Sequence, residues 1–312
     1  MARQTYTNIA AAAENDDIGL TARNQLARML IQDGNVDEGR EYINEILAVD
    51  STNIEALMMH GGLALVDGEY RDAINDFRNV LRKEPSQERA HYLLARTHLQ
   101  AGDRVLAKDA YRRVLELNPD NGIATMELAQ ILFADQQFAA AESLLRSRLL
   151  VAPGDVRASQ MLIGLLVNDN QYVNAEAEAR RLLSVTDESA MADYLLGSVL
   201  QIQGKPEPAM EYLTKALDKA PESPEALQGY VTGLKETQGQ VAAERYLKAH
   251  VEKYPEQLHA IALLSQVQAG LGDTQGAGQT LQAALEKNEA WLPAYTGLAS
   301  MQAGDISKQI EI

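Results

Sequence analysis

Histidine is the first side chain to consider for chemistry, because imidazole binds metal ions and exchanges protons near neutral pH. The five histidines are His60, His91, His98, His250 and His259. His91 and His98 lie seven residues apart, which places them on one helical face, but no third ligand stands at a suitable spacing. The chain has no cysteine, so thiolate metal sites, disulfides and cysteine nucleophiles are excluded. We therefore expect no metal site and no cofactor.

Catalytic motifs are equally absent from the sequence. It contains no glycine-rich phosphate loop, no nucleophile elbow and no paired carboxylates. His60, His98 and His250 fall on the apolar helical stripes described next, which favours partly buried structural roles. The sequence thus predicts a protein that is not an enzyme.

The elements that position these residues follow a period of 34. Alanine recurs nine times at this spacing, at Ala22, Ala56, Ala90, Ala124, Ala158, Ala192, Ala226, Ala260 and Ala294. A large side chain follows each alanine by four residues, as Leu26 follows Ala22. Spacing by four keeps these residues on one stripe of a helix, so each unit is expected to begin with an amphipathic first helix.

A turn and a second helix complete the unit. Gly34, Gly68, Gly102, Gly204 and Gly272 recur with the same period, and Gln136 and Asn170 stand in the same register. Glycine and asparagine favour the left-handed conformation that ends a helix. A second apolar stripe follows, as in Ala73, Phe77 and Leu81, and proline closes the unit, as at Pro85.

The small residue, leucine, glycine, aromatic, alanine, aromatic and proline in this order and period resemble the tetratricopeptide repeat family. The set Gly68-Glu69-Tyr70 with Ala73, Phe77 and Pro85 carries the resemblance. It implies an all-α fold, a right-handed superhelical solenoid of antiparallel helix pairs. The family's aromatic residue near the start of the first helix is missing from most units, where Leu57, His91, Thr125, Ser159 and Asp193 stand.

The repeat predicts the domain organisation. Residues 1–19 are expected to form a partial repeat or a capping helix, and residues 292–312 a truncated ninth unit. The eight complete units between them are 20–53, 54–87, 88–121, 122–155, 156–189, 190–223, 224–257 and 258–291. Because the chain stops at Ile312, midway through an expected second helix after the turn at Gly304, we expect it to be a fragment of a longer array.

Extra glycines mark the units 224–257 and 258–291. They lie near or within helices, at Gly229, Gly233, Gly239, Gly270, Gly276 and Gly278. Glycine weakens a helix interior, so one interpretation is a flexible segment. The other is that some of them, Gly233 especially, permit close contact between helices.

The face opposite the core stripe is the expected site of function. With the repeating alanine counted as the third residue of a unit, the second, fifth, ninth, twelfth and thirteenth residues cluster on this face, and we call them the inner positions. They hold apolar residues where polar ones would suffice, namely Met58, Leu65, Tyr92, Leu99, Met126, Phe133, Val167 and Tyr194. Such an apolar stripe is typical of an interaction surface, although the fifth and twelfth positions could instead pack between successive first helices.

In the family, the inner positions line a concave groove, so the resemblance implies a binding channel edged by Arg28, Arg96, Gln130 and Asn168. Such a groove suits an amphipathic helix or an extended apolar peptide. The family's clamp for the C-terminal carboxylate of a chaperone uses lysine and asparagine. Here its positions hold Met58 and Gly62, Tyr92 and Arg96, and Met126 and Gln130, so we expect no such clamp.

Charge and hydropathy narrow the partners and the compartment. The formal charge of −16 argues against nucleic acid and anionic lipid. The basic stretch 78–113 is interpreted mainly as a solvated face, with a site for an acidic partner as the alternative. No apolar run is long enough for a membrane span. The protein is expected to be cytoplasmic, or periplasmic or outer-membrane-associated if a leader is missing.

The sequence therefore predicts a scaffold that binds a protein or peptide partner. The alternatives are self-assembly through uncapped ends, and a positioning arm of an enzyme whose catalytic domain lies outside this chain. The stretch 291–305, with Trp291-Leu292-Pro293 and Gly304-Asp305, resembles long bacterial envelope arrays. Those arrays accompany exopolysaccharide or exosortase-type (PEP-CTERM) export systems, which implies a role in envelope assembly.

Overall fold

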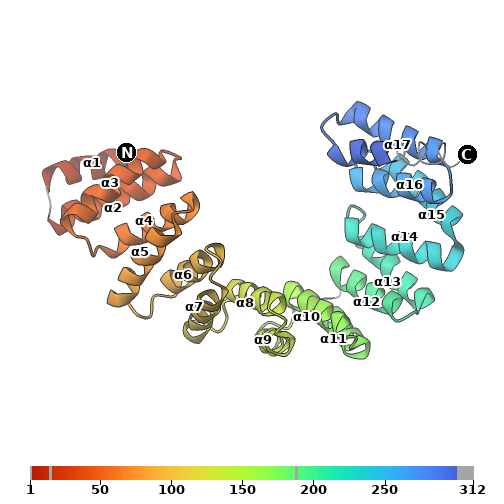
Figure 1. The fold of residues 1–312 in the computed structure, drawn as a ribbon, viewed down its shortest axis with the longest axis horizontal. Helices are drawn as coiled ribbons and strands as arrows, with labels where there is room; N and C mark the ends of the chain where they lie inside the picture. Colours follow the sequence, from red (N-terminus) through yellow and green to blue (C-terminus); the bar gives the residue numbers. More distant parts are fainter. Residues whose placement is uncertain (1, 14–15, 187–188, 301–312) are drawn as a thin grey trace, which may run out of the picture. The chain divides into compact units, whose positions relative to one another are not determined.

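The computed structural model describes residues 2–13, 16–186 and 189–300, and the regular structure in these ranges is entirely α-helical (Figure 1). The helices are α1 Ala2–Ala12, α2 Asp17–Gln32, α3 Val36–Val49, α4 Ile54–Asp67, α5 Tyr70–Lys83, α6 Glu88–Gln100, α7 Arg104–Leu117, α8 Gly122–Ala134, α9 Phe138–Val151, α10 Val156–Asn168, α11 Tyr172–Val185, α12 Ala190–Ile202, α13 Pro206–Lys219, α14 Pro224–Gln238, α15 Gln240–Lys253, α16 Leu258–Gly270 and α17 Thr274–Lys287. Residues 292–300 are also helical. The predicted turn at Gly304 and the rest of the ninth unit lie outside the described residues. The all-α prediction is confirmed.

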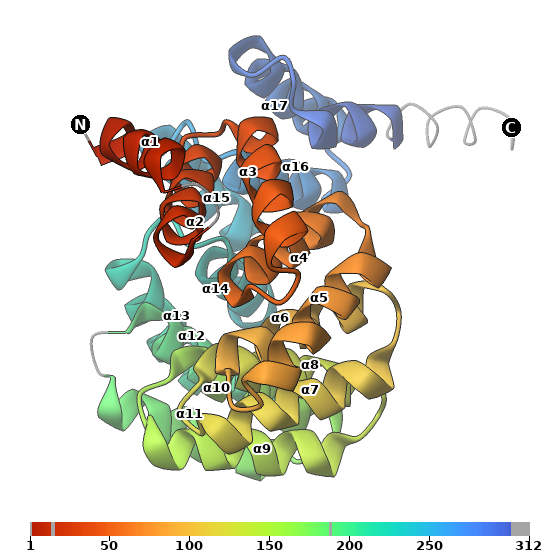
Figure 2. The same ribbon diagram turned by 90° about the vertical axis from the view of Figure 1, so that its left-hand side faces the viewer.

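The chain divides into two compact units, Met1–Val151 and Ala152–Ile312, which we call the N-terminal and C-terminal units. In each, consecutive helices pack against each other as antiparallel pairs. Within the N-terminal unit, the first helices α4, α6 and α8 follow one another on one side, and α5, α7 and α9 lie on the other (Figure 1). In the C-terminal unit, α12 and α13 lie side by side in both views (Figure 2).

The turns between the paired helices adopt the predicted left-handed conformation. Gly34, Gly68, Gly102, Gly204 and Gly272 have φ between +72° and +87°. Gln136 and Asn170, which occupy the same register without being glycine, have φ of 60° and 57°. Gly239, at φ +87°, turns one residue later than the register predicts, so α14 is longer than the other first helices from α4 onward.

Short polar side chains start several first helices. Asn53, Asn121, Asp155, Ser189 and Ser223 each accept a hydrogen bond from the backbone N–H three residues later. These caps satisfy amide groups that would otherwise lack a partner at the helix start. They help to set where each first helix begins.

The nine repeating alanines are buried, as their place on the core stripe predicts. All nine, from Ala22 to Ala294, are at most 2% exposed. Phe77 and Tyr111, on the second helices α5 and α7, are fully buried. The core thus combines small side chains, which let helices approach each other, with large side chains that fill the remaining space.

In two repeats of the C-terminal unit, buried polar pairs stand in place of the aromatic residue that is usual in the family. The hydroxyl of Ser159 donates a hydrogen bond to Glu178 Oε1 at 2.7 Å, and Arg181 pairs with the same carboxylate. In the next unit, Lys219 Nζ lies 2.7 Å from Asp193 Oδ2. These contacts satisfy polar groups that burial would otherwise penalise.

Gly233 permits close helix contact, which is the second of the two interpretations of the extra glycines. A Cβ atom there would overlap the Met210 thioether and lie 3.0 Å from Gln201 Nε2. The residue therefore marks a place where α14 is packed tightly against its neighbours.

Candidate partner-binding grooves

A groove of about 620 Å³ runs over the inner positions of α4 in the N-terminal unit. Met58, Met59 and Leu63 supply apolar, half-buried lining, and Arg28 from α2 and Arg89 from α6 bring positive charge to it. We call it the α4 groove. Its volume lies within the range that suits ligand side chains, and its methionines can adapt to different shapes.

Gly62 keeps this groove open. A Cβ atom built on Gly62 meets nothing within 4 Å, so no neighbouring helix requires glycine there. The absent side chain leaves space in the groove, which Gly62 also lines. The glycine therefore contributes to the shape of the binding surface and not to packing.

Leu65 does not belong to this surface, contrary to the sequence expectation. It is only 6% exposed and packs in a core cluster with Ala73 and Phe77. The neighbouring Val66 is 83% exposed and lines the groove instead. The twelfth position of this unit faces α5 because the paired helix approaches closely there, and the thirteenth faces outward.

On α6, Tyr92 and Arg96 lie together on the inner face. The guanidinium carbon of Arg96 lies 6.0 Å from the centroid of the Tyr92 ring, and that ring packs edge-on against Tyr111 at 6.1 Å. Burial, followed by the nearby Glu127 carboxylate, raises the pKa of Tyr111. Leu99 is half-buried on the same helix.

On α8, apolar side chains are exposed at the inner positions. Phe133 is 40% exposed and packs against Phe138 at 5.4 Å between ring centroids. Met126 is half-buried, and Gln130 is exposed. Ile123, which is 65% exposed, occupies the second position of the same unit and was missed, although its register could have identified it.

In the C-terminal unit the predicted residues are dispersed. Val167 is half-buried and Asn168 exposed at the end of α10. Tyr194 packs against a core cluster that includes Leu227 and Val231. None of the three lines the groove between α16 and residues 292–300.

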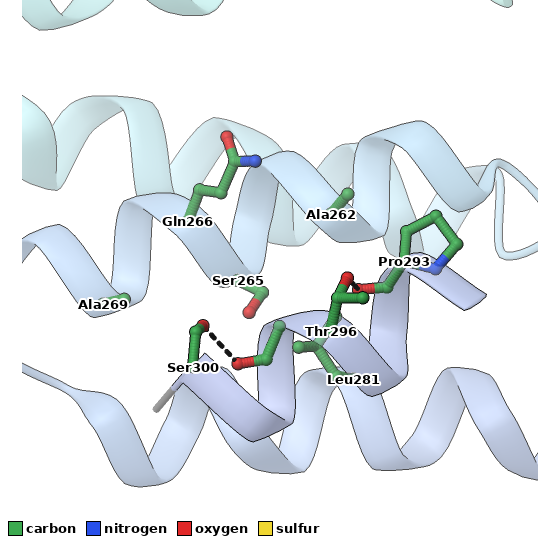
Figure 3. Close-up of a pocket in the computed structure, with 9 residues that line it drawn as sticks. Ala262, Ser265, Gln266, Ala269, Leu281, Pro293, Thr296 and Ser300 are labelled. Carbon is green, nitrogen blue, oxygen red and sulfur yellow. Dashed lines mark hydrogen bonds between the residues drawn. The ribbon is translucent and has the colours of Figure 1, made fainter. Parts of the chain in front are cut away.

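A second groove, of about 520 Å³, lies between α16 and residues 292–300 (Figure 3). Six inner positions of the eighth and ninth units line it, at Ala262, Gln266, Ala269, Pro293, Thr296 and Ser300. The hydroxyls of Thr296 and Ser300 donate to the backbone carbonyls of Pro293 and Gly297, as Figure 3 shows. Its small, internally satisfied side chains gave no signal in the sequence.

Four of the nine basic side chains in the stretch 78–113 pair with acidic side chains, as on a solvated face. Arg104 and Lys108 both contact Asp135. Arg112 and Arg113 pair with acids on their own helix. Arg89 and Arg96 are not among these four: no carboxylate of the described residues lies within ion-pair distance of either one, and they are the two basic residues of the stretch that stand at inner positions.

Three of the five histidines, His60, His91 and His250, have hydrogen-bond partners within the protein. His60 Nδ1 lies 2.6 Å from Asp76 Oδ2, and this hydrogen bond raises the pKa of His60 against the opposing effect of burial. His98 is buried, and burial followed by the Arg78 charge lowers its pKa. His250 Nε2 lies 2.8 Å from Gln257 Oε1. Among the residues that the structure describes, no three His, Asp or Glu side chains gather closely enough to hold a metal ion.

Within residues 2–13, 16–186 and 189–300, no helix combines the length and the apolar character that crossing a membrane would need.

Two solved structures are similar to this chain in part. A structure reported in the functional characterization of Pseudomonas aeruginosa pilF is 20% identical, with a TM-score of 0.47, and covers 68% of this chain and 97% of that one. A tetratricopeptide repeat protein from Parabacteroides merdae is 16% identical, with a TM-score of 0.47, and covers 74% of this chain and 91% of that one.

A short stretch matches a protein of Drosophila melanogaster, FK506-binding protein 59. The two are 38% identical over 53 residues, which is 17% of this chain. The match spans only 12% of the length of that protein.

Family models give the broadest sequence match. Two models described as tetratricopeptide repeat match residues 58–107 and 163–224, and 98–166. Together they span residues 58–224 without a gap, which is more than half of the chain. Repeats of this family form scaffolds for protein–protein interaction and are generally not catalytic. The chain therefore belongs to the tetratricopeptide repeat family and is a protein–protein interaction scaffold.

Proposed function

We propose that the N-terminal unit binds a segment of a partner protein across the inner positions of α4, α6 and α8. The observation that carries this proposal is the α4 groove, a hollow lined by both apolar and polar side chains and held open by a glycine that no packing contact requires. A glycine in the middle of a helix costs roughly 0.5–1 kcal/mol relative to alanine. Because Gly62 also lines the groove, we infer that a side chain of the ligand occupies the space that the missing side chain leaves.

The exposed apolar side chains on α8 extend the proposed surface. Ile123 and Phe133 are apolar but remain exposed to solvent, because they do not pack in the core. Apolar area that is left in water is stabilised when a partner covers it. Half-buried Tyr92 and Met126 supply an amphipathic contact and an adaptable one between these groups.

The experiment fills the groove with a side chain from the protein itself. In Gly62→Leu, the new side chain occupies the α4 groove without meeting neighbouring atoms at Cβ. Gly164→Leu is the matched control, because Gly164 holds the same ninth position on α10 and a Cβ atom there also meets nothing within 4 Å. Both variants should fold and retain full helicity by circular dichroism.

Peptides from a random library displayed on phage are then selected for binding to each of the three proteins. Wild-type protein and Gly164→Leu should enrich a shared set of peptides, and Gly62→Leu should lose it. Enrichment that is equal on all three proteins, or absent from the wild type, would contradict binding in the α4 groove.

We also propose that the partner belongs to a bacterial envelope or export assembly. This rests on the resemblance of the repeats around Trp291 to those of envelope arrays. Fractionation of cells that express the natural gene tests it, since recovery of the protein in the cytosolic fraction alone would exclude an envelope role.

A further inference from the structure

We infer that the partner segment is acidic as well as apolar. Its carboxylates pair with Arg89 and Arg96 on α6, and its apolar side chains contact α4 on one side and α8 on the other. This inference rests on the proposed function and specifies the chemistry of the partner.

The inner positions of the N-terminal unit carry the opposite charge to the whole chain. The protein has 44 acidic and 28 basic side chains, with a formal charge of −16. Yet the inner positions from residue 20 to residue 155 contain three arginines, Arg28, Arg89 and Arg96, and one acid, Glu55. Glu55 already lies 3.7 Å from Arg28. The uncompensated positive charge therefore lies on α6.

The two arginines of α6 are available to an incoming carboxylate. Their neighbours Arg104 and Lys108, on the second helix of the same unit, are engaged by Asp135. In contrast, no described carboxylate lies within ion-pair distance of Arg89 or Arg96. Two unpaired guanidinium groups on one helix face complement an anionic ligand.

Arg96 is also oriented in advance. Its guanidinium group lies beside the ring of Tyr92, which is itself held by Tyr111. A guanidinium group near an aromatic ring keeps its N–H donors for a carboxylate and loses less conformational entropy on binding. The arrangement favours recognition by a fixed arginine over a loose attraction between charges.

Apolar side chains flank α6 on both sides. Met58 and Val66 belong to α4, and Ile123 and Phe133 belong to α8. A segment that crosses these three helices meets apolar, basic and apolar surface in turn. Covering the apolar flanks removes water from around the arginines, which strengthens their attraction to a carboxylate.

A nucleic acid would also present negative charge to Arg89 and Arg96. Its phosphates would gain nothing from the apolar flanks, and the net charge of the chain repels a polyanion. We therefore favour an acidic peptide, and a single-stranded oligonucleotide serves as the competing probe in the test.

The test uses a peptide recovered from the phage selection and dependent on Gly62, synthesised with a fluorescent label. A second version replaces its acidic residues with glutamine. The acidic peptide should bind about tenfold more tightly than the neutral one, because a charge-assisted hydrogen bond contributes about that much to affinity. Arg89→Gln and Arg96→Gln should each reduce that difference and together abolish it, while Arg157→Gln, at the second position of α10, should leave it unchanged.

Fluorescence anisotropy at low and high salt gives the readout, and each outcome is decisive. If the peptides whose binding depends on Gly62 lack acidic residues, the inference is overturned and the proposed groove remains intact. The same holds if the protein still prefers the acidic peptide after both arginine substitutions. An oligonucleotide that displaces the peptide and needs the same arginines would favour nucleic acid instead. If no recovered peptide depends on Gly62, the proposed function itself fails.

Discussion

Lys219 Nζ lies 2.7 Å from Asp193 Oδ2 and so joins the first turn of α12 to the last turn of α13. Asp193 is 1% exposed and stands where the family usually has an aromatic residue. We expect Asp193→Ala to lower the free energy of unfolding by about 2 kcal/mol, because the charged hydrogen bond is lost inside the core. Urea denaturation followed by circular dichroism measures the change. The exposed Asp218→Ala on α13 is the control, and an equal loss in both variants would show that the buried pair has no special role.

His60 and His98 should titrate on opposite sides of the ordinary histidine pKa. The hydrogen bond to Asp76 raises the pKa of His60, and burial lowers the pKa of His98. The stabilisation from His60 is therefore fully present below the unfolded-state pKa of about 6.5 and is lost as pH rises through the folded-state pKa. The contribution of His98 is present above about 6.5 and is lost as pH falls towards its lowered pKa.

Nuclear magnetic resonance of the imidazole protons measures both titrations directly. In Asp76→Asn the pKa of His60 should fall towards its ordinary value, and that of His98 should not move. Midpoints for the two histidines that coincide would contradict the environments described for them.

Two glycines should respond to alanine in opposite ways. Gly62→Ala should raise the free energy of unfolding by roughly 0.5–1 kcal/mol, because alanine favours the helix and the new Cβ meets no atom. Gly233→Ala should lower it, since the new Cβ would overlap Met210. Thermal unfolding of both variants tests the pair, and stabilisation by Gly233→Ala would support a loosely packed α14.

Gln136 adopts a left-handed backbone that glycine would tolerate better. Its φ is 60°, a conformation that costs a residue with a Cβ roughly 1 kcal/mol. Gln136→Gly should therefore stabilise the protein by somewhat less than this, because glycine also gains entropy in the unfolded state. Gln137→Gly, one residue later, should bring no gain, and an equal gain there would point to a cause other than the turn.

Much of the fold follows from local chemistry in the sequence. The turn register correctly included Gln136 and Asn170, because asparagine itself favours this conformation and the 34-residue period outweighs the weak preference of glutamine. The buried pairs were not predictable, since Ser159 and Asp193 find partners 19 and 26 residues away on another helix. Their geometry depends on how the two helices pack, which residue spacing does not encode.

The binding surface was predictable only in part. A helical wheel places Leu65 and Val66 on the same broad face, yet one is buried and the other is exposed. The depth to which the paired helix overlaps a position decides between them. The groove beside Ser300 was missed for another reason, because alanine, serine and threonine leave space without marking it.

The open position at Gly62 has a consequence for engineering. A screen for heat resistance would favour residues with a side chain there, because they strengthen α4 and their Cβ meets no neighbouring atom. Selection for thermal stability alone would thus produce a more stable scaffold whose groove is filled by its own side chain. Any thermostabilised version of this protein should keep position 62 fixed and seek its gains elsewhere.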